Sequence, residues 1–393
     1  GSQIKTKKQQ VCRAGDLVVA EMDAKFGGYG FIPDHLEGAI VSSHYYLYEL
    51  DKNKITQEYF EILIKTDFIQ NQIEAKGSTN YSSIRAWEFL DYEIPLQSIA
   101  LQNIIAAKYL KHSRFKEDLG IELHAQLKYL SQLRQRILQE AIEGKLTAKW
   151  RDKHPDLISG DNHASKLLEK IKVEKERLVK EGRIKKDKPL ALISDDEKPF
   201  DLPAGWVWCR LGEVIELLMG QSPDGISYNT ACKGVPLVNG PVEFGGMKPF
   251  EKTLAIKFTT QPTKMCKKGD LLLCVRGSTT GRTNIAGYDS CIGRGVAAVR
   301  PILMESPYLN YLILNYRNSF YDLGTGSTFP NISQDKIINF KIALPSITEQ
   351  QVIVRRVGNL MTNIDELEKQ VSDRKEQSEM LMQSVLRESF AKE

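Results

Sequence analysis

Polar side chains that can contact base pairs gather in one glycine-rich segment of the sequence. Residues 275–284 (VRGSTTGRTN) follow an apolar run, 271–274, that predicts a buried strand. An arginine can contact guanine O6 and N7 together, an asparagine can contact adenine, and a serine or threonine can contact a base or a phosphate. The glycines allow the backbone to approach a ligand closely. The segment is compatible with an ordinary polar turn and with a DNA-contacting loop, and composition alone does not favour the loop.

Similar chemistry is present in other segments of the chain. In the second half these are 293–295, which contains an arginine, and 324–331. In the first half the corresponding segments are 23–29 and 76–81, with Arg85 nearby. Each could equally be a polar turn, so composition alone leaves both interpretations open.

Motifs for catalysis are absent from the sequence. It contains no GxxxxGK[ST] phosphate loop, no GxGxxG after a strand, no HExxH zinc motif and no GxSxG nucleophile elbow. The six histidines show no spacing typical of metal ligands or of a catalytic base. Six scattered cysteines without a CxxC pair are typical of free, mostly buried thiols in a reducing cytoplasm. The sequence therefore favours a binding protein over an enzyme, with no metal site.

The second half of the sequence repeats the first. Residues 15–20 (GDLVVA) recur as 269–274 (GDLLLC), and residues 94–99 recur as 342–347. A unit present twice presents its surface twice, so two related recognition surfaces are expected. Further pairs are 77–79 with 326–328, Gln102 with Gln350, and 137–142 with 385–390.

The spacing of the two copies is constant in one part and variable in another. From residue 94 to residue 142 the copies keep a fixed separation, whereas the loops between Gly15 and Gly77 differ in length from their counterparts. Residues 202–268 precede Gly269, but only residues 1–14 precede Gly15. We therefore expect constant spacers, variable recognition surfaces, and a first recognition unit that lacks its opening segment.

Two kinds of element must position these surfaces. Residues 10–95 and 202–344 carry glycine-rich turns and short β-branched runs, which predict β-rich units, with one covering helix over 56–75. Residues 98–144 have a helical period with a predicted break at Gly120, and residues 360–385 follow an unbroken heptad spacing. Two such helices, each with an apolar stripe, most simply pack on each other.

The segment between the helices and the second β-rich unit is strongly charged. Residues 166–177 predict an exposed helix, and residues 183–189 a mobile linker. A contact between this basic run and DNA phosphates is the alternative.

Composition sets few further limits. A net charge of +4 permits nucleic-acid binding without arguing for it, and 41% hydrophobic residues is ordinary for a soluble protein. No apolar run approaches the ~18 residues of a membrane span, and no secretory signal opens the chain. The leading Gly1 and Ser2 are interpreted as an expression scar and set aside.

The ordered, duplicated set of segments resembles the specificity subunit of type I restriction–modification systems. The resemblance spans nearly the whole chain, and no single segment is decisive. The segments that carry it are 137–150, 202–208, 269–287, 293–301, 324–333, 343–357 and 385–390.

The resemblance implies an α+β fold, in which two β-rich target-recognition domains are joined by two long antiparallel coiled-coil helices in a pseudo-two-fold repeat. The expected domains are the C-terminal part of a first target-recognition domain (1–97), a first spacer-helix region (98–150), a charged helix and linker (151–200), a second target-recognition domain (201–344) and a second spacer-helix region (345–393).

The family resemblance also implies the partners. The chain would be a non-catalytic, cytoplasmic subunit that binds double-stranded DNA at a split site. It would dock two methyltransferase subunits, which bring S-adenosylmethionine and modify adenine, and restriction/translocase subunits, which use ATP and magnesium. No cofactor is expected in this chain, and no membrane contact.

Specific residues follow from the match to the family's recognition loops and helices. The implied DNA-contacting residues are Arg276, Ser278, Thr279, Thr280, Arg282, Thr283, Asn284, Arg294, Ser327 and Asn331 in the second unit, and Lys25, Tyr29, Ser78, Thr79, Asn80 and Arg85 in the first. The implied helix-packing residues are Leu123, Leu127, Leu130, Ile137, Leu360, Ile364, Leu367, Val371, Leu381 and Val385.

Two other hypotheses remain open at this point. One is a coiled-coil scaffold whose globular ends bind proteins. The other is a nuclease with an atypical site.

Overall fold

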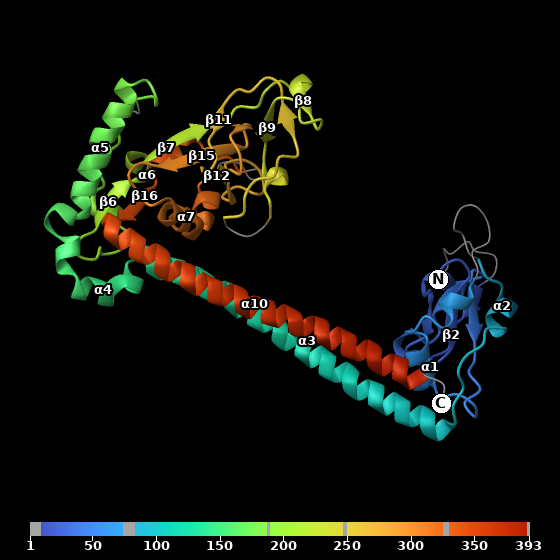
Figure 1. Ribbon diagram of the computed structural model, residues 1–393. Helices are drawn as coiled ribbons and strands as arrows, with labels where there is room; N and C mark the ends of the chain where they lie inside the picture. The colour runs from blue at the N-terminus through green and yellow to red at the C-terminus, as the bar shows by residue number, and fades with distance from the viewer. Residues whose placement is uncertain (1–8, 74–82, 187–188, 247–249, 325–329, 391–393) are drawn as a thin grey trace. The chain divides into compact units, whose positions relative to one another are not determined.

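The chain forms two compact units, each with a β-rich part and one end of each of two long helices (Figure 1). The first unit comprises residues 1–128 and 368–393, and the second comprises residues 129–367. The long helices are α3 (Ile99–Ile142) and α10 (Ile347–Phe390). The α+β fold class predicted from the sequence is confirmed. The computed structural model describes residues 9–73, 83–186, 189–246, 250–324 and 330–390.

Two small antiparallel sheets form the β-rich part of the first unit. Strand β2 (Leu17–Ala20) lies between β3 (Tyr29–Phe31) and β5 (Tyr45–Tyr48), and β1 (Gln9–Val11) pairs with β4 (Ile40–Ser42). The helical elements are α1 (Gln57–Leu63), α2 (Ala86–Leu90) and the short turns η1 (Ala24–Phe26), η2 (Asp34–Leu36) and η3 (Gln70–Gln72).

The helix predicted over residues 56–75 is shorter than expected. Thr56 begins it, because its hydroxyl accepts a hydrogen bond from the Tyr59 amide at 3.3 Å. The helix ends at Leu63, where the hydroxyl of Thr66 donates to the Leu63 carbonyl at 2.5 Å. This bond satisfies a carbonyl that the next helical turn would otherwise use.

The second unit contains a larger β structure. Its four-stranded sheet has the order β13–β12–β15–β7, its five-stranded sheet has the order β11–β14–β9–β10–β8, and β16 pairs with β6. Buried residues that include Val238 of the five-stranded sheet and Leu272 of the four-stranded sheet form one core cluster. The strands are β6 (Val207–Arg210), β7 (Ile215–Met219), β8 (Tyr228–Asn229), β9 (Val235–Val238), β10 (Phe258–Thr259), β11 (Met265–Cys266), β12 (Leu271–Cys274), β13 (Thr283–Ile285), β14 (Ser290–Ile292), β15 (Val296–Pro301) and β16 (Lys341–Leu344).

Short helices complete the second unit. They are α4 (Ala148–Lys153), α5 (Ala164–Lys180), α6 (Leu211–Val214), α7 (Ser306–Asn315), α8 (Arg317–Asp322), α9 (Gln334–Ile338), η4 (Lys145–Thr147), η5 (Pro155–Ile158), η6 (Gly160–Asn162), η7 (Asp195–Glu197), η8 (Gly225–Ser227) and η9 (Pro241–Glu243).

The sequence repeat is a structural repeat. The strand order β3–β2–β5 of the first unit matches β13–β12–β15 of the second, and the pair β1–β4 matches β11–β14. The turn before the central strand is also the same. The amide of Gly15 donates to the Ile32 carbonyl, and the amide of Gly269 donates to the Ala286 carbonyl, both at 2.9 Å.

The repeated glutamines have the same role in both units. Gln102 and Gln350 are fully buried near the starts of α3 and α10. The Gln102 side-chain oxygen accepts from the Thr56 amide at 2.7 Å, and that of Gln350 accepts from the Glu305 amide at 3.0 Å. Thr56 and Glu305 directly precede α1 and α7. Each long helix is thus tied to the first turn of a helix in the β-rich part.

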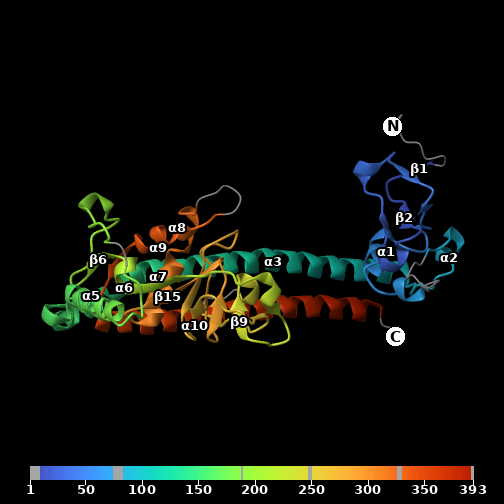
Figure 2. The same cartoon turned by 90° about the horizontal axis from the view of Figure 1, so that it is seen from above.

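Within each unit, one end of α3 packs against one end of α10 (Figure 2). In the first unit, Ile105 of α3 shares a core cluster with Met382 and Phe390 of α10. In the second unit, Ile137 of α3 shares a core cluster with Ile364 of α10. The start of α3 meets the end of α10, and the end of α3 meets its start, so the pairing is antiparallel.

Most of the predicted packing residues are buried, but three are not. Leu130, Ile137, Leu360 and Ile364 lie in or against the core of the second unit, and Leu123, Val371 and Val385 are buried as well. Leu127, Leu367 and Leu381 are between 43% and 48% exposed, so their assignment to the interface was wrong. A straight α-helix drifts relative to a strict heptad. The buried face therefore passes through Met382, which is 8% exposed, instead of Leu381.

Gly120 does not break the helix, contrary to the prediction. Helix α3 is continuous from Ile99 to Ile142. A glycine costs about 1 kcal/mol relative to alanine in a helix, less than the packing of the buried residues on either side of it provides. Among the helices that the structure describes, none combines the length and apolarity needed to cross a membrane.

The charged segment predicted as an exposed helix has a buried face. Ile171 of α5 is fully buried, and Leu167, Leu168 and Leu178 pack against the core of the second unit. The Lys175 ammonium donates to the Gly212 carbonyl of α6 at 2.5 Å. The abundant charges obscured this apolar stripe in the sequence, because they occupy the remaining positions of the helix.

The thiols should differ sharply in reactivity. Cys232 is exposed, and the other five cysteines are buried. Burial raises the pKa of Cys266 and of Cys274 to about 11, so neither forms much reactive thiolate at about pH 8. We expect iodoacetamide to modify the native protein at Cys232 alone, and all six cysteines in urea, as measured by intact mass and peptide mapping. Modification of Cys274 in the native protein would contradict this burial.

Candidate nucleic-acid interface

The predicted recognition segment is the loop that connects β12 to β13, here called the 275–282 loop. The Gly281 amide donates to the Cys274 carbonyl, and the Cys274 amide donates to the Arg282 carbonyl, both at 2.8 Å. Gly277 and Gly281 have φ values of 90° and 84°, a region that disfavours other residues. A Cβ on Gly281 would lie 2.7 Å from the Arg317 carbonyl oxygen, so the loop rests directly on the start of α8.

A second segment, residues 330–332, crosses the base of this loop. The Gly277 amide donates to the Pro330 carbonyl at 3.0 Å, and the Ile332 amide donates to the Val275 carbonyl at 2.9 Å. Arg276 and Asn331 form an isolated β-bridge at the crossing. The backbone on both sides of Arg276 is therefore fixed.

The structure separates the predicted residues of the second unit into three groups. Ser278 and Arg294 are exposed, as are Arg276 and Asn331 at the crossing. Thr279, Arg282 and Thr283 are half-buried, and Thr280 and Asn284 are buried. Ser327 lies outside the described residues.

Two of these residues are misassigned as DNA contacts. Thr280 is 3% exposed, and its hydroxyl donates to the Pro330 carbonyl at 3.0 Å, so it holds the crossing together. Asn284 is 0% exposed and pairs with Leu272 across the strands, on the face that forms the core between the sheets. Strand alternation puts Asn284 inside, which the loop-like composition of the segment concealed.

The Arg282 guanidinium is also engaged within the protein. Its guanidinium donates to the Gly246 carbonyl and lies 5.5 Å from the centre of the Phe244 ring. This cation–π contact and hydrogen bond give Arg282 a structural role at the edge of the loop.

The first unit has the same crossing with different side chains. The Ile84 amide donates to the Glu21 carbonyl at 2.9 Å, as Ile332 does to Val275. Lys25 and Tyr29 are half-buried, and burial raises the pKa of Tyr29. Arg85 is exposed, and its backbone amide donates to Glu88 at 2.7 Å. Ser78, Thr79 and Asn80 lie outside the described residues.

Sequence reasoning missed three exposed residues beside the crossings. In the first unit, Met22 and Phe26 are 43% and 73% exposed, where the second unit has its polar loop. In the second unit, Arg317 is exposed next to Gly281. Arg317 is remote in sequence from the 275–282 loop, so no local pattern could have found it.

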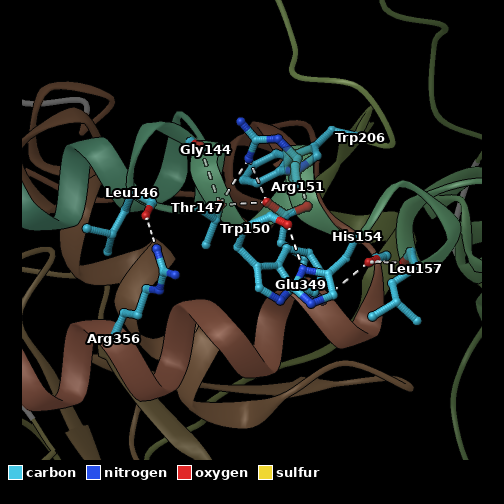
Figure 3. Close-up of polar contacts among 11 residues, drawn as sticks. Gly144, Leu146, Thr147, Trp150, Arg151, His154, Leu157, Trp206, Glu349 and Arg356 are labelled. Carbon is cyan, nitrogen blue, oxygen red and sulfur yellow. Dashed lines mark hydrogen bonds and ion pairs between the residues drawn. The ribbon is translucent and has the colours of Figure 1, made fainter.

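A buried carboxylate connects the long helices to the second β-rich part (Figure 3). Glu349 near the start of α10 is fully buried. It accepts hydrogen bonds from the Thr147 hydroxyl at 2.6 Å, the Arg151 guanidinium at 2.6 Å and the Trp206 indole N–H at 2.7 Å. These four residues, here called the Glu349 cluster, join the segment after α3, the start of α10 and the residue before β6.

Known proteins resemble this chain in sequence and in fold. Residues 203–376 match the family described as the type I restriction modification DNA specificity domain. The EcoEI type I restriction enzyme specificity subunit of Escherichia coli is 32% identical over 265 residues, which cover 60% of this chain and 41% of that relative. This chain spans less than half the length of the curated relatives it matches first.

Two solved structures share the fold. The HsdS subunit from Thermoanaerobacter tengcongensis has a TM-score of 0.59 and 24% identity, over 99% of this chain and 84% of that one. A chain from a structure of complex assembly and conformational transition in the type I R-M system has a TM-score of 0.65 and 22% identity, over 99% of this chain and 85% of that one.

Proposed function

Because residues 203–376 match the family of type I restriction modification DNA specificity domains, we propose that this chain selects the DNA sequence on which a type I complex acts. In this proposal, each β-rich part contacts one half of a split site on double-stranded DNA. The paired helices set the distance between the halves. The observation that carries the proposal is the structural repeat, in which both units build the same backbone crossing with different exposed side chains.

Two exposed arginines of the second unit suit a polyanion, one at the crossing and one in the turn between β14 and β15. Arg276 and Arg294 are exposed, and within the described part of the chain neither guanidinium forms an ion pair with a carboxylate. Unpaired arginines can bind a guanine edge or a phosphate without first breaking a salt bridge. The glycines of the loop, which carry no side chain, allow the backbone to approach such a ligand closely.

The chemistry of the complex would reside on other subunits. We propose that two methyltransferase subunits dock to this chain and modify adenine with S-adenosylmethionine, and that restriction/translocase subunits use ATP and magnesium. The chain itself would contribute binding, and no cofactor. Among the described residues, no three histidine, cysteine, aspartate or glutamate side chains cluster in a way that could hold a metal ion.

An exchange of the second β-rich part tests the proposal. Residues 206–340 are replaced by the corresponding segment of the EcoEI relative, and the methylated sites in a host that carries the methyltransferase partner are mapped by sequencing. We expect one half of the split motif to change while the other half stays the same, which serves as the internal control. An unchanged motif would mean that residues 206–340 do not select the DNA sequence, as expected of a scaffold. Cleavage of DNA by the purified chain with magnesium alone would indicate a nuclease.

A further inference from the structure

Arg317 lies beside the 275–282 loop of the second unit, and the proposed function has not yet given it a role. It is the first residue of α8. Its carbonyl oxygen lies so close to Gly281 of the 275–282 loop that a side chain on Gly281 would not fit. The Arg317 guanidinium and that of Arg282 both influence the Cys274 thiol at the base of the loop, where they act to lower its pKa against the larger effect of burial. Arg317 is exposed, and within the described residues its guanidinium forms no ion pair.

The backbone that carries Arg317 is firmly held. Phe320 of α8 is fully buried, and its ring centre lies 4.6 Å from that of Phe340. Tyr316, just before α8, packs on the same Phe340 ring at 4.9 Å. The side-chain amide of Gln135 on α3 donates to the Asn315 side chain at 3.2 Å. The start of α8 is therefore anchored both to the core and to a long helix.

The first unit repeats this arrangement with a neutral residue. Gly27 corresponds to Gly281 and also has a positive φ, of 84°. A Cβ on Gly27 would lie 3.0 Å from the side-chain nitrogen of Gln70, which opens η3. A helical turn thus supports the loop glycine in both units, and in the second unit that turn carries a positive charge.

We infer that Arg317 is a DNA-phosphate contact that positions the 275–282 loop on its half-site. This inference rests on the proposed function. A cation on an anchored helix is suited to contact the DNA backbone, because the phosphates of a duplex lie at similar positions whatever the base sequence. Arg317 would then fix the position of the 275–282 loop on the DNA, and exposed residues of that loop would contact the bases.

The salt dependence of DNA binding tests this role. Binding of the full chain to its target duplex and to an unrelated duplex is measured across a salt series for the wild type, Arg317→Ala, Arg317→Lys and Lys170→Ala. Lys170 of α5 is exposed and has no ion pair among the residues that the structure describes, so Lys170→Ala removes the same charge at a different place. We expect Arg317→Ala to reduce the slope of log K against log salt by about 1, and to weaken binding to both duplexes about 5- to 10-fold at about 0.1 M salt. Arg317→Lys should keep the wild-type slope, and Lys170→Ala should match the wild type.

The possible outcomes distinguish a wrong role for Arg317 from a wrong proposed function. If the wild type prefers its target duplex but Arg317→Ala keeps the wild-type slope, the role of Arg317 is wrong and the proposed function stands. A change of base preference in Arg317→Ala would likewise overturn a phosphate contact. If the wild type shows no preference for any duplex, the proposed function fails, and the role of Arg317 fails with it. Unchanged melting of each variant establishes that the fold is intact.

Discussion

Replacing Glu349 by alanine should lower the free energy of unfolding of the second unit by about 3–5 kcal/mol. Glu349 is fully buried, and it is the acceptor for the Arg151 guanidinium, the Trp206 indole N–H and the Thr147 hydroxyl. The Arg151 side chain is only 11% exposed, so the substitution leaves a nearly buried cation without its counterion. Urea unfolding followed by tryptophan fluorescence measures the loss, because Trp206 belongs to the cluster.

Two further variants make this prediction specific to the cluster. Glu349→Gln retains one carbonyl oxygen but loses the charge, so we expect an intermediate loss of about 1–3 kcal/mol. Glu366→Ala removes an exposed glutamate from the same helix and should change stability by less than about 0.5 kcal/mol. Equal stability of Glu349→Ala and Glu366→Ala would show that the cluster contributes nothing.

The Glu349 cluster also illustrates what the sequence could not reveal. Thr147, Arg151, Trp206 and Glu349 belong to three segments that are remote along the chain. In the sequence, Glu349 is one charged residue near the start of an amphipathic helix, where an exposed position is the ordinary expectation. Only the tertiary arrangement buries it and brings three donors to it.

The repeat was the most reliable guide to the fold, because it compares the sequence with itself. Matching segments predicted two β-rich units and two helices, and the strand orders and the buried glutamines Gln102 and Gln350 agree in both copies. The function of these glutamines was not visible in the sequence. Gln102 accepts a hydrogen bond from the Thr56 amide, and Gln350 accepts one from the Glu305 amide. The comparison of the two copies did not connect these residues.

The predictions failed where a one-residue difference changes which face a side chain occupies. Heptad spacing selected Leu381, but the helix buries Met382. Loop-like composition selected Asn284, but the strand β13 begins at Thr283, and alternation turns Asn284 into the core. In both cases the type of element was right, and the exact phase depended on packing that local sequence does not encode.

Under the proposed function, replacing Arg276 by alanine should weaken binding to the target sequence by about 1–3 kcal/mol and relax the preference at one base pair. Arg276 is exposed, and the β-bridge to Asn331 and the adjacent Gly277 fix its backbone. A guanidinium held in this way can contact guanine O6 and N7 together, which no other base pair reproduces. Binding to a panel of duplexes, each with one base pair changed, measures the preference position by position.

The comparison with Arg317→Ala gives this prediction its strongest test. A base contact and a phosphate contact both involve an arginine, but only the base contact depends on the identity of the base pair. Arg276→Ala should therefore flatten the response at one position of the panel, whereas Arg317→Ala should weaken every duplex alike. Arg276→Lys should restore part of the affinity and less of the discrimination, because an ammonium does not reproduce the two parallel hydrogen bonds of a guanidinium. If Arg276→Ala weakens all duplexes equally, Arg276 binds a phosphate, and base recognition must come from other exposed residues of the crossing, with Ser278 and Asn331 the next to substitute.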